Sequence, residues 1–332
     1  MNSVTHVVLT GGVGSRLWPL SRKSRPKQYI PLFEGKSLFQ LCVLRNNLIC
    51  NDLLIVGNES NRDLSVQNLK EIHQDNFNEI VEVTPRNTSA AIAFAAFSLG
   101  NEAVMLVTPS DQVVTGEKEY ERSILEAISL AKENYLVTFG IKPSRPETGY
   151  GYIEFQDNDV VSFREKPDKK KAEDYVKSGR YLWNSGMFCF KADIFLEELK
   201  MYEPEIYNFS KNAFENILEN KLNLEDSNLI PSKSVDYAVM ERSKKIKVVS
   251  ADFGWSDLGS FDSLWEYFDA HDDGPTRQNL VLGTNKHVEF LGVDNIVFVE
   301  TDDAILILPR SMSQDVKNVY ERLEREKPEL LK

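Results

Sequence analysis

Histidine and cysteine are scarce in this sequence, and their spacing argues against two kinds of site. The chain of 332 residues has four histidines, which lie far apart, and none has the spacing of a zinc site. Its three cysteines, Cys42, Cys50 and Cys189, form no CxxC pair. An odd number of cysteines predicts reduced thiols that pack in the core. We therefore expect neither a zinc centre nor a disulfide framework.

Features of a membrane or secreted protein are also missing. No apolar run approaches about 18 residues, and the N-terminus has neither the basic nor the apolar segment of a signal peptide. The net charge of -12 argues against nucleic acid or an anionic membrane as the main partner. We expect a cytoplasmic protein that binds no nucleic acid and no membrane. Its hydrophobic fraction of 42% is ample for a core.

The start of the chain has no acidic residue before Glu34. A run of apolar or β-branched residues at 7–10 leads into Gly11, Gly12 and Gly14. Glycine takes positive φ and has no Cβ, so its backbone approaches a ligand closely, and consecutive N–H groups form a concavity that suits a phosphate. The basic residues that follow are Arg16, Arg22, Lys23, Arg25 and Lys27. On an acidic chain, this positive segment predicts a cradle for a small polyphosphate.

Two better-known phosphate motifs are absent. The P-loop pattern G-x-x-x-x-G-K-[ST] does not occur. A dinucleotide fingerprint needs a third glycine where Leu17 stands and an acid closing the second strand, which instead ends in Gly57-Asn58. The sequence therefore disfavours a dehydrogenase.

Short apolar segments alternate with amphipathic ones through the first half of the chain. We expect strands at residues 5–10, 53–57, 80–83, 103–108 and 135–139, and helices at 37–47, 61–74, 88–99 and 118–133. This alternation predicts the α/β class, with a mostly parallel sheet and helices on both faces. Ligands bind at the carboxyl ends of such strands, which places the glycine loop, residues 85–87 and residues 109–111 on one rim.

After residue 140 the pattern is looser. We expect strands at 149–155, 160–163 and 181–190 and helices at 169–177, 192–218, 234–244 and 260–268, forming a more antiparallel second layer over the rim. A boundary is expected at 271–275, followed by strands at 288–291, 296–300 and 304–308 and a polar helix at 312–329. The predicted domains are 1–270, with halves 1–140 and 141–270, and a small β-rich region at 271–332.

The glycine loop is more specific as a whole than in its parts. Gly-Gly-x-Gly-x-Arg-Leu-Trp-Pro-Leu-Ser-Arg at residues 11–22, with Pro-Lys-Gln at 26–28, resembles the signature of sugar-1-phosphate nucleotidylyltransferases. The Trp18-Pro19 form is similar to the branch that makes GDP-mannose. The resemblance implies a Rossmann-like, mixed and mostly parallel sheet of the nucleotide-diphospho-sugar transferase type. It also suggests a homodimer contact in the C-terminal region, and the isomerase domain of some longer relatives is expected to be missing.

The same resemblance implies a reaction, in which GMP passes from GTP to mannose 1-phosphate to give GDP-mannose and pyrophosphate. The residues it assigns to the nucleotide are Leu9, Gly11, Gly12, Gly14, Ser15, Arg16, Arg86, Asn87, Ser110 and Asp111. The Arg-Asn-Thr form at 86–88 resembles the guanylyl branch. No physical argument from the sequence alone selects guanine over the other bases.

Two aspartates that follow apolar strands are candidate metal ligands. Asp111 follows the strand at 103–108, and Asp257 follows a strand at 245–250. Mg²⁺ prefers one or two carboxylates together with substrate phosphates and waters. From the residues alone, each aspartate fits equally well as a cap of the next loop or helix. The resemblance implies that both hold one Mg²⁺, and that Gln112, which cannot titrate, stands where relatives usually carry histidine.

The sugar-phosphate site is likewise implied by the resemblance, and its members are Lys27, Gly149, Tyr150, Glu165, Lys166, Asn184 and Asp236. Arg16, Lys27 and Lys166 would be the catalytic residues, because they neutralise phosphates. A sugar phosphate has a second pKa of about 6, so the attacking oxygen is already anionic and needs no general base. The remaining barrier is the repulsion of two anions, which fixed positive charge lowers.

Three alternatives remain open from the sequence. The nearest is a nucleotidylyltransferase that uses another base or another sugar phosphate. The second is a dehydrogenase on a similar sheet, and the third is a non-catalytic relative that binds a nucleotide sugar. Binding without turnover would distinguish the last of these.

Overall fold

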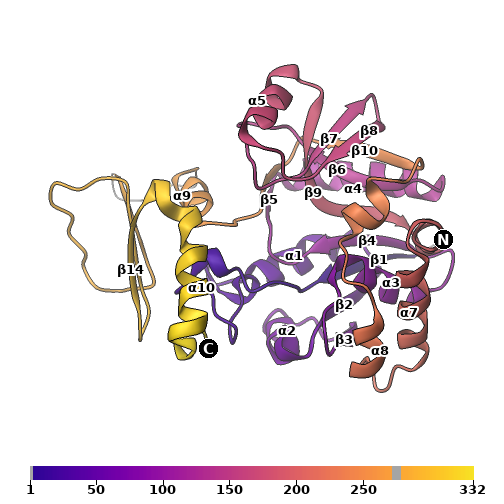
Figure 1. The fold of residues 1–332 in the computed structure, drawn as a ribbon, viewed down its shortest axis with the longest axis horizontal. Helices are drawn as coiled ribbons and strands as arrows, with labels where there is room; N and C mark the ends of the chain where they lie inside the picture. The colour runs from indigo at the N-terminus through magenta and orange to yellow at the C-terminus, as the bar shows by residue number, and fades with distance from the viewer. Residues whose placement is uncertain (1–2, 271–277) are drawn as a thin grey trace.

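The computed structural model describes residues 3–270 and 278–332, and it confirms the α/β class (Figure 1). The expected alternation is present in the first half. Its strands are β1 (Val4–Leu9), β2 (Asp52–Asn58), β3 (Asn78–Glu82), β4 (Val104–Pro109) and β6 (Leu136–Ile141). Its helices are α1 (Leu38–Asn46), α2 (Arg62–Glu71), α3 (Asn87–Leu99) and α4 (Glu117–Lys132). Ser37 caps α1 with a capping box, as its place before an apolar-periodic segment predicts.

The second half of the chain extends the same sheet. Its strands are β7 (Tyr152–Gln156), β8 (Asp159–Arg164), β9 (Tyr181–Lys191) and β10 (Ile246–Ala251). The nine-stranded order is β3-β2-β1-β4-β9-β6-β10-β8-β7, and β9 pairs antiparallel with both β4 and β6. The pairings make β8 and β9 run against the other strands, so the sheet is mixed and mostly parallel. The expected second layer over the rim is therefore wrong, because β9 inserts between β4 and β6.

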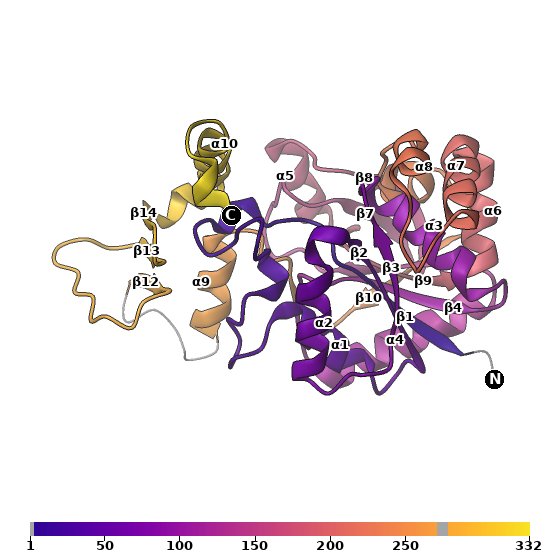
Figure 2. The same cartoon turned by 90° about the horizontal axis from the view of Figure 1, so that it is seen from below.

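Helices cover both faces of this sheet, as Figure 2 shows. On one face, α3 packs with α6 (Ala192–Tyr202) and α7 (Pro204–Glu215) against apolar side chains such as Val7. On the other face, α1 and α2 pack against Val8 and its neighbours, and α4 covers the middle strands. Because β1 is buried on both faces, its apolar residues Val7, Val8 and Leu9 follow one another without alternation, and its two polar residues, Thr5 and His6, are buried as well.

Two helices were predicted with the wrong extent. The helix expected at 192–218 is two helices, because Pro204 disfavours helical geometry at Glu203, whose φ is -138°. The segment expected as a helix at 234–244 holds only a short π-helix, Asp236–Met240. The remaining helices of this half are α5 (Lys169–Ser178), α8 (Leu224–Leu229) and α9 (Phe261–Ala270).

The C-terminal region forms a separate three-stranded sheet at one end of the molecule (Figure 1). Its strands are β12 (Asn279–Leu282), β13 (Ile296–Glu300) and β14 (Ile305–Pro309), followed by α10 (Val316–Glu326). The strand expected at 288–291 is wrong, since these residues form no strand and the third strand is β12. The boundary expected at 271–275 lies outside the described residues. The terminal helix is amphipathic, and it buries Val316, Tyr320 and Leu323 in a cluster with Trp18.

The outer strand of this sheet exposes apolar side chains. On β14, Ile305 and Ile307 are 57% and 63% exposed. The homodimer contact expected in this region stays a prediction. Among the helices of residues 3–270 and 278–332, none is both long enough and apolar enough to cross a membrane.

Candidate active site

The glycine loop leaves β1 at the carboxyl edge of the sheet. Gly12 and Gly14 have φ values of 88° and 76°, which disfavour other residues. A Cβ on Gly14 would lie 2.6 Å from Cβ of Lys27, so glycine is needed for close packing there. A Cβ on Gly11 or Gly12 would meet no atom within 4 Å. Gly11 and Gly12 therefore face open space at the rim. Gly14 packs the loop against the side chain of Lys27.

The Pro-Lys-Gln segment at 26–28 braces this loop from behind. The buried Gln28 donates from Nε2 to the carbonyls of Thr10 at 3.2 Å and Gly12 at 3.3 Å. The N–H of Lys27 donates to the carbonyl of Val13 at 3.1 Å. No role was assigned to Gln28 from the sequence. The only indication of a role was its position in the Pro-Lys-Gln motif. Because its amide group binds the carbonyls of the loop, these carbonyls point toward Gln28 and the N–H groups of the loop point away from it.

Lys27 joins the two candidate metal ligands. Its side chain is 6% exposed, and Nζ lies 2.8 Å from Oδ2 of Asp111 and 2.6 Å from the backbone oxygen of Asp257. A two-stranded ribbon of β5 (Val113–Thr115) and β11 (Gly254–Ser256) pairs Val113 with Ser256, which brings the two aspartate segments side by side. The structure therefore places Lys27, Asp111 and Asp257 together.

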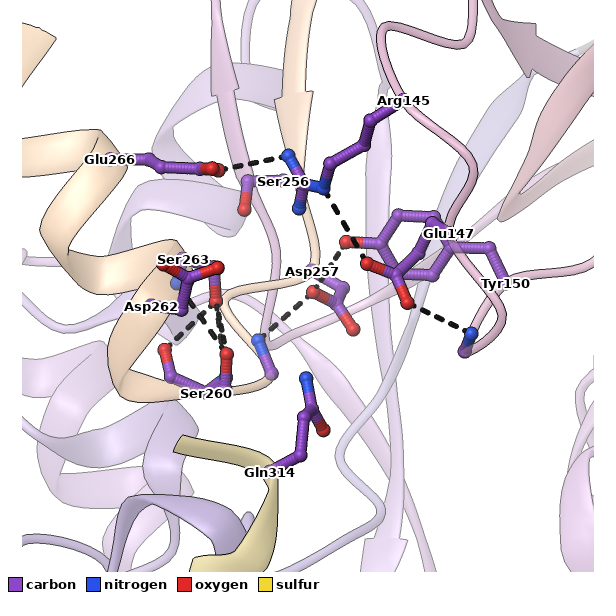
Figure 3. A network of polar contacts seen from close by, with 12 residues as sticks. Arg145, Glu147, Tyr150, Ser256, Asp257, Ser260, Asp262, Ser263, Glu266 and Gln314 are labelled. Carbon is purple, nitrogen blue, oxygen red and sulfur yellow. Dashed lines mark hydrogen bonds and ion pairs between the residues drawn. The ribbon is translucent and has the colours of Figure 1, made fainter. Parts of the chain in front are cut away.

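Asp257 is held in a fixed orientation (Figure 3). Its Oδ1 accepts hydrogen bonds from the Tyr150 hydroxyl and the Gly259 N–H, both at 2.9 Å. Burial and the Asp257 carboxylate raise the pKa of Tyr150, which keeps its hydroxyl a donor. Because both hydrogen bonds use Oδ1, Oδ2 is the oxygen left for a cation.

Asp111 and Asp257 are the two carboxylates that would hold Mg²⁺, and a metal that proteins enclose completely would need more ligands than these two. Among the described residues, no group of three or more His, Cys, Asp or Glu side chains is arranged to hold a metal. Mg²⁺ is commonly bound by one or two carboxylates, with phosphate oxygens and waters completing its octahedron. Asp111 and Asp257 would supply the carboxylates and a substrate the phosphates.

A cavity of about 380 Å³ opens beside the glycine loop at the ends of β1 to β4. The residues assigned to the nucleotide that line it are Leu9, Gly11, Gly12, Asn87 and Asp111. Asp236, assigned to the sugar phosphate, also lines it. Ser110 lies beneath the rim, where its N–H donates to the Leu9 carbonyl at 3.1 Å. The cavity is large enough for a nucleobase and ribose, and several expected residues meet in it.

Glu82, the last residue of β3, also lines this cavity and was missed from the sequence. It is 7% exposed, and burial raises its pKa to about 7. Within the described part of the chain, its Oε1 has no hydrogen-bond partner. A buried polar atom without a partner is costly and is rare in native proteins. The signal in the sequence was a carboxylate near the end of the strand expected at 80–83, just before the rim.

Other basic residues near the loop have different partners from those expected. Arg22 is buried and pairs with Asp303 at 2.5 Å, and Lys23 pairs with Glu324 at 2.6 Å, so both hold the C-terminal region. The expectation that these two belong to the polyphosphate cradle is wrong. Arg86 donates from Nε to the Ile230 carbonyl at 2.6 Å and does not line the cavity.

Arg16 stays near the rim. With Ser15 it forms a short 3-10 helix, Ser15–Leu17, directly after Gly14. It lines a smaller hollow that also contains Gly149, Tyr150 and Asp257. Gly149 is exposed, and its N–H donates to Oε1 of Glu147 at 3.0 Å. Arg16, Gly149 and Tyr150 therefore lie on the side of the site where Asp257 is found.

The remaining residues assigned to the sugar phosphate form a second group. Nζ of Lys166 lies 2.8 Å from Oε1 of Glu165, which raises the pKa of Lys166. Asn184 donates from Nδ2 to Oδ1 of Asp236 at 2.8 Å. Burial, with a contribution from Glu165, raises the pKa of Asp236. Gly151 has no side chain where a Cβ would lie 2.5 Å from Oε2 of Glu165. This group combines donors, acceptors and one cation, as a sugar phosphate requires.

Both the nitrogen and the oxygen of the Gln112 side-chain amide form hydrogen bonds within the fold. Its Nε2 donates to the Ser185 carbonyl at 2.6 Å, and its Oε1 accepts from Trp255 Nε1 at 3.0 Å. It therefore connects β9 with β11 behind Asp111. Trp183 and Asn184 precede Ser185 on β9, and Trp183 is buried.

Comparison with known proteins gives consistent matches. The model of the family described as "Nucleotidyl transferase" matches residues 5–274, and that of "MannoseP isomerase/GMP-like beta-helix domain" matches residues 275–323. Proteins named mannose-1-phosphate guanylyltransferase are similar to this chain. The one from Salmonella montevideo is 38% identical over 97% of this chain and 74% of its own length. The one from Escherichia coli strain K12 is 39% identical over 96% and 73%.

Solved structures agree on the fold. A Thermus thermophilus protein described as a mannose-1-phosphate geranyltransferase has a TM-score of 0.85 and 28% identity, covering 97% of this chain and 99% of its own. A Helicobacter pylori protein described as a mannose-6-phosphate isomerase has a TM-score of 0.70 and 35% identity, covering 76% and 99%.

Proposed function

The chain belongs to the nucleotidyl transferase family, and from this premise we propose that it transfers GMP from GTP to mannose 1-phosphate, giving GDP-mannose and pyrophosphate. The names of its relatives support mannose 1-phosphate as the acceptor. The observation that carries the choice of nucleotide is the buried Glu82 carboxylate, whose Oε1 has no partner in the described residues and which lines the cavity beside the glycine loop.

The chemistry of Glu82 favours guanine. An ionised carboxylate only accepts hydrogen bonds. Guanine presents two adjacent donors, N1–H and the N2 amino group, which a carboxylate accepts together. Adenine and cytosine place a ring acceptor beside their amino donor, and uracil and thymine flank one donor with two carbonyls. Each of these leaves a repulsive contact with a carboxylate, whereas guanine satisfies both of its oxygens.

The proposed reaction needs positive charge rather than a general base. The phosphate of mannose 1-phosphate has a second pKa of about 6, so it is already a nucleophile near neutral pH. Arg16 and Lys27 would hold the triphosphate, and Lys166 would hold the phosphate of the sugar in line with the α-phosphorus. Asp111 and Asp257 would hold Mg²⁺, which supplies further positive charge at the phosphates. Glu165, Asn184 and Asp236 would orient the sugar hydroxyls.

A panel of nucleotides tests this proposal. Pyrophosphate release is measured with mannose 1-phosphate and each of GTP, ATP, UTP and dTTP. We expect kcat/KM for GTP to exceed the others by at least about tenfold, because one mismatched bidentate contact costs about 1–3 kcal/mol. A higher value with another nucleotide would refute the guanine assignment, and no release with any of them would refute the transferase.

Changing Glu82 to glutamine tests the proposed contact itself. Glutamine keeps the shape but opposes one guanine donor with its own amino group. We expect kcat/KM for GTP to fall by about tenfold to a hundredfold. Glu79→Gln is the matched control, because Glu79 lies on the same strand and pairs with Arg62 outside the cavity. Equal effects of the two substitutions would contradict the contact.

The raised pKa of Glu82 gives this contact a pH dependence. With a pKa of about 7, the carboxyl is mostly protonated at pH 6 and mostly ionised at pH 8. Since guanine binds the ionised form, KM for GTP should fall over this interval in the unsubstituted protein and change less in Glu82→Gln. The folded state binds the extra proton between the ordinary pKa of 4.5 and about 7, so Glu82 lowers stability as pH rises through that window. Glu82→Gln should therefore unfold at a higher temperature than the unsubstituted protein at pH 8.

A substitution of Lys166 tests which of the two substrates this residue binds. Its side chain is 65% exposed and meets Glu165 rather than the glycine loop. We expect Lys166→Ala to raise KM for mannose 1-phosphate severalfold more than KM for GTP. Lys169→Ala, on the exposed start of α5, is the control and should change neither value. An equal rise for both substrates would overturn the assignment of Lys166 to the sugar side.

A further inference from the structure

Arg16 is contacted by a residue from the far end of the chain. Its Nη1 donates to Oε1 of Gln314 at 2.8 Å, although the two residues are 298 positions apart. Gln314 lies in a short 3-10 helix, Arg310–Asp315, between β14 and α10. In Figure 3 its side chain points toward the turn that carries Asp257 and Ser260. A residue of the C-terminal region therefore reaches the edge of the candidate active site.

The other terminal nitrogen of the Arg16 guanidinium, Nη2, lies close to Gly259. A Cβ on Gly259 would lie 3.1 Å from Nη2 of Arg16, closer than most real Cβ contacts. The N–H of Gly259 is bonded to the Asp257 carboxylate. The guanidinium is thus held between the Asp257 turn and Gln314, and its place depends on both.

Of the carboxylates near this position, Glu147, Glu266 and Asp262 pair with other arginines, and Asp257 accepts from Tyr150 and Gly259. Arg145 lies 3.0 Å from Oε2 of Glu266 and 3.6 Å from Oε2 of Glu147 (Figure 3). Arg310 forms an ion pair with Asp262. The partner that Arg16 does have is an amide oxygen, which accepts a hydrogen bond and carries no net charge. An amide fixes the direction of the guanidinium and leaves its charge available to a phosphate.

The C-terminal region that carries Gln314 is attached to the segment after the glycine loop. Arg22 pairs with Asp303, and Trp18 donates from Nε1 to the Leu330 carbonyl at 3.0 Å. The N–H of Lys23 donates to the Leu331 carbonyl at 2.8 Å. These contacts attach the C-terminal region to the segment that follows Arg16. These contacts therefore hold the C-terminal region, and Gln314 with it, beside the segment that carries Arg16.

We propose that Gln314 is a positioning residue that directs Arg16 toward the triphosphate, so that the C-terminal region completes the nucleotide site. This inference rests on the proposed function, because it assumes that Arg16 binds phosphates. It adds a neutral amide from residues 310–315 to a site built otherwise from residues 9–257. It predicts that the charge at position 314, and not only its bulk, controls nucleotide affinity.

The test compares three variants of the full chain: Gln314→Ala, Gln314→Glu and, as the control, Asn318→Ala, which removes an exposed amide on α10. GTP binding is measured by calorimetry, and KM is measured for both substrates. Loss of one hydrogen bond to a charged group should weaken GTP binding about fivefold to tenfold in Gln314→Ala. Gln314→Glu should weaken it further, because a carboxylate neutralises Arg16. KM for mannose 1-phosphate, unfolding temperature and the Asn318→Ala values should not change.

The outcomes separate the two proposals. If the unsubstituted chain binds GTP and both Gln314 variants bind it as tightly, the inference is overturned and the proposed function stands. The same holds if the two variants raise KM for both substrates equally, since that is the effect of a structural role. If the unsubstituted chain binds no GTP, both proposals fail.

Discussion

Exchanging Asp257 or Asp111 for asparagine should lower Mg²⁺-dependent turnover more than about a hundredfold, the scale of losing a preorganised electrostatic contact in a reaction of this kind. Asparagine keeps the shape of aspartate but carries no charge. In Asp257→Asn the amide oxygen still accepts from Tyr150 and Gly259, so the turn is expected to stay folded. In Asp257→Asn the loss should therefore appear in turnover and not in unfolding temperature.

The measurement is the initial rate of pyrophosphate release as a function of Mg²⁺ concentration. Asp252→Asn is the matched control, because Asp252 lies just before β11 and forms an exposed pair with Arg122. The control should keep the rate of the unsubstituted protein. Near-normal rates in both Asp111→Asn and Asp257→Asn would show that the metal assignment is wrong.

Replacing Lys27 with methionine should have the second largest effect. Methionine fills most of the volume of the buried side chain but leaves Asp111 without its cation and the Asp257 carbonyl without its donor. We expect turnover to fall about a hundredfold to a thousandfold, since removing one preorganised charge or donor costs about 2.7–4 kcal/mol in the transition state. The free energy of unfolding should also fall, by about 1–3 kcal/mol, because a buried acceptor loses its partner.

Steady-state kinetics and thermal unfolding measure these two effects separately. Lys36→Met, at an exposed position on the same segment, is the control and should change neither. Lys27→Arg should not restore activity, because the planar fork of arginine does not fit the space of an ammonium ion. A Lys27→Met protein with normal kcat would remove Lys27 from the proposed mechanism.

The part of the site that depends on strand ends could be predicted from the sequence. Parallel strands end at one edge, so β1 and β4 had to bring Gly11 and Asp111 to the same rim, and the cavity there contains both. The succession of strands and helices in the first half is equally local, because short apolar runs mark the strands and longer segments mark the helices. These predictions required no knowledge of distant contacts.

The proximity of Asp111 and Asp257 depends on a contact between segments that are far apart in the sequence. It comes from the β5–β11 ribbon, whose strands of three residues are too short to show a period. The position of β9 inside the main sheet could not be predicted either, because its apolar and aromatic residues identify a strand but not its neighbours. Similarly, the apolar residues at 288–291 suggested a strand, whereas the pairing partner of β13 is β12 at Asn279–Leu282.

The residues that were missed are polar groups whose roles depend on distant partners. Glu82 became a candidate only when its carboxylate was found in the cavity wall. Gln314 has no local signal at all, because the guanidinium that it contacts belongs to the other end of the chain. A single glutamine on a polar segment is usually a surface residue, and the fold alone distinguishes this one.

A crystal structure with bound GTP tests the central claim most directly. The claim is that one rim of the sheet binds the nucleotide, with its base at Glu82 and its phosphates at the glycine loop. The account predicts guanine N1 and N2 at about 3 Å from the Glu82 carboxylate, and phosphates over residues 11–14 within reach of Arg16 and Lys27. A nucleotide bound elsewhere, or a base that turns another edge toward Glu82, would contradict it.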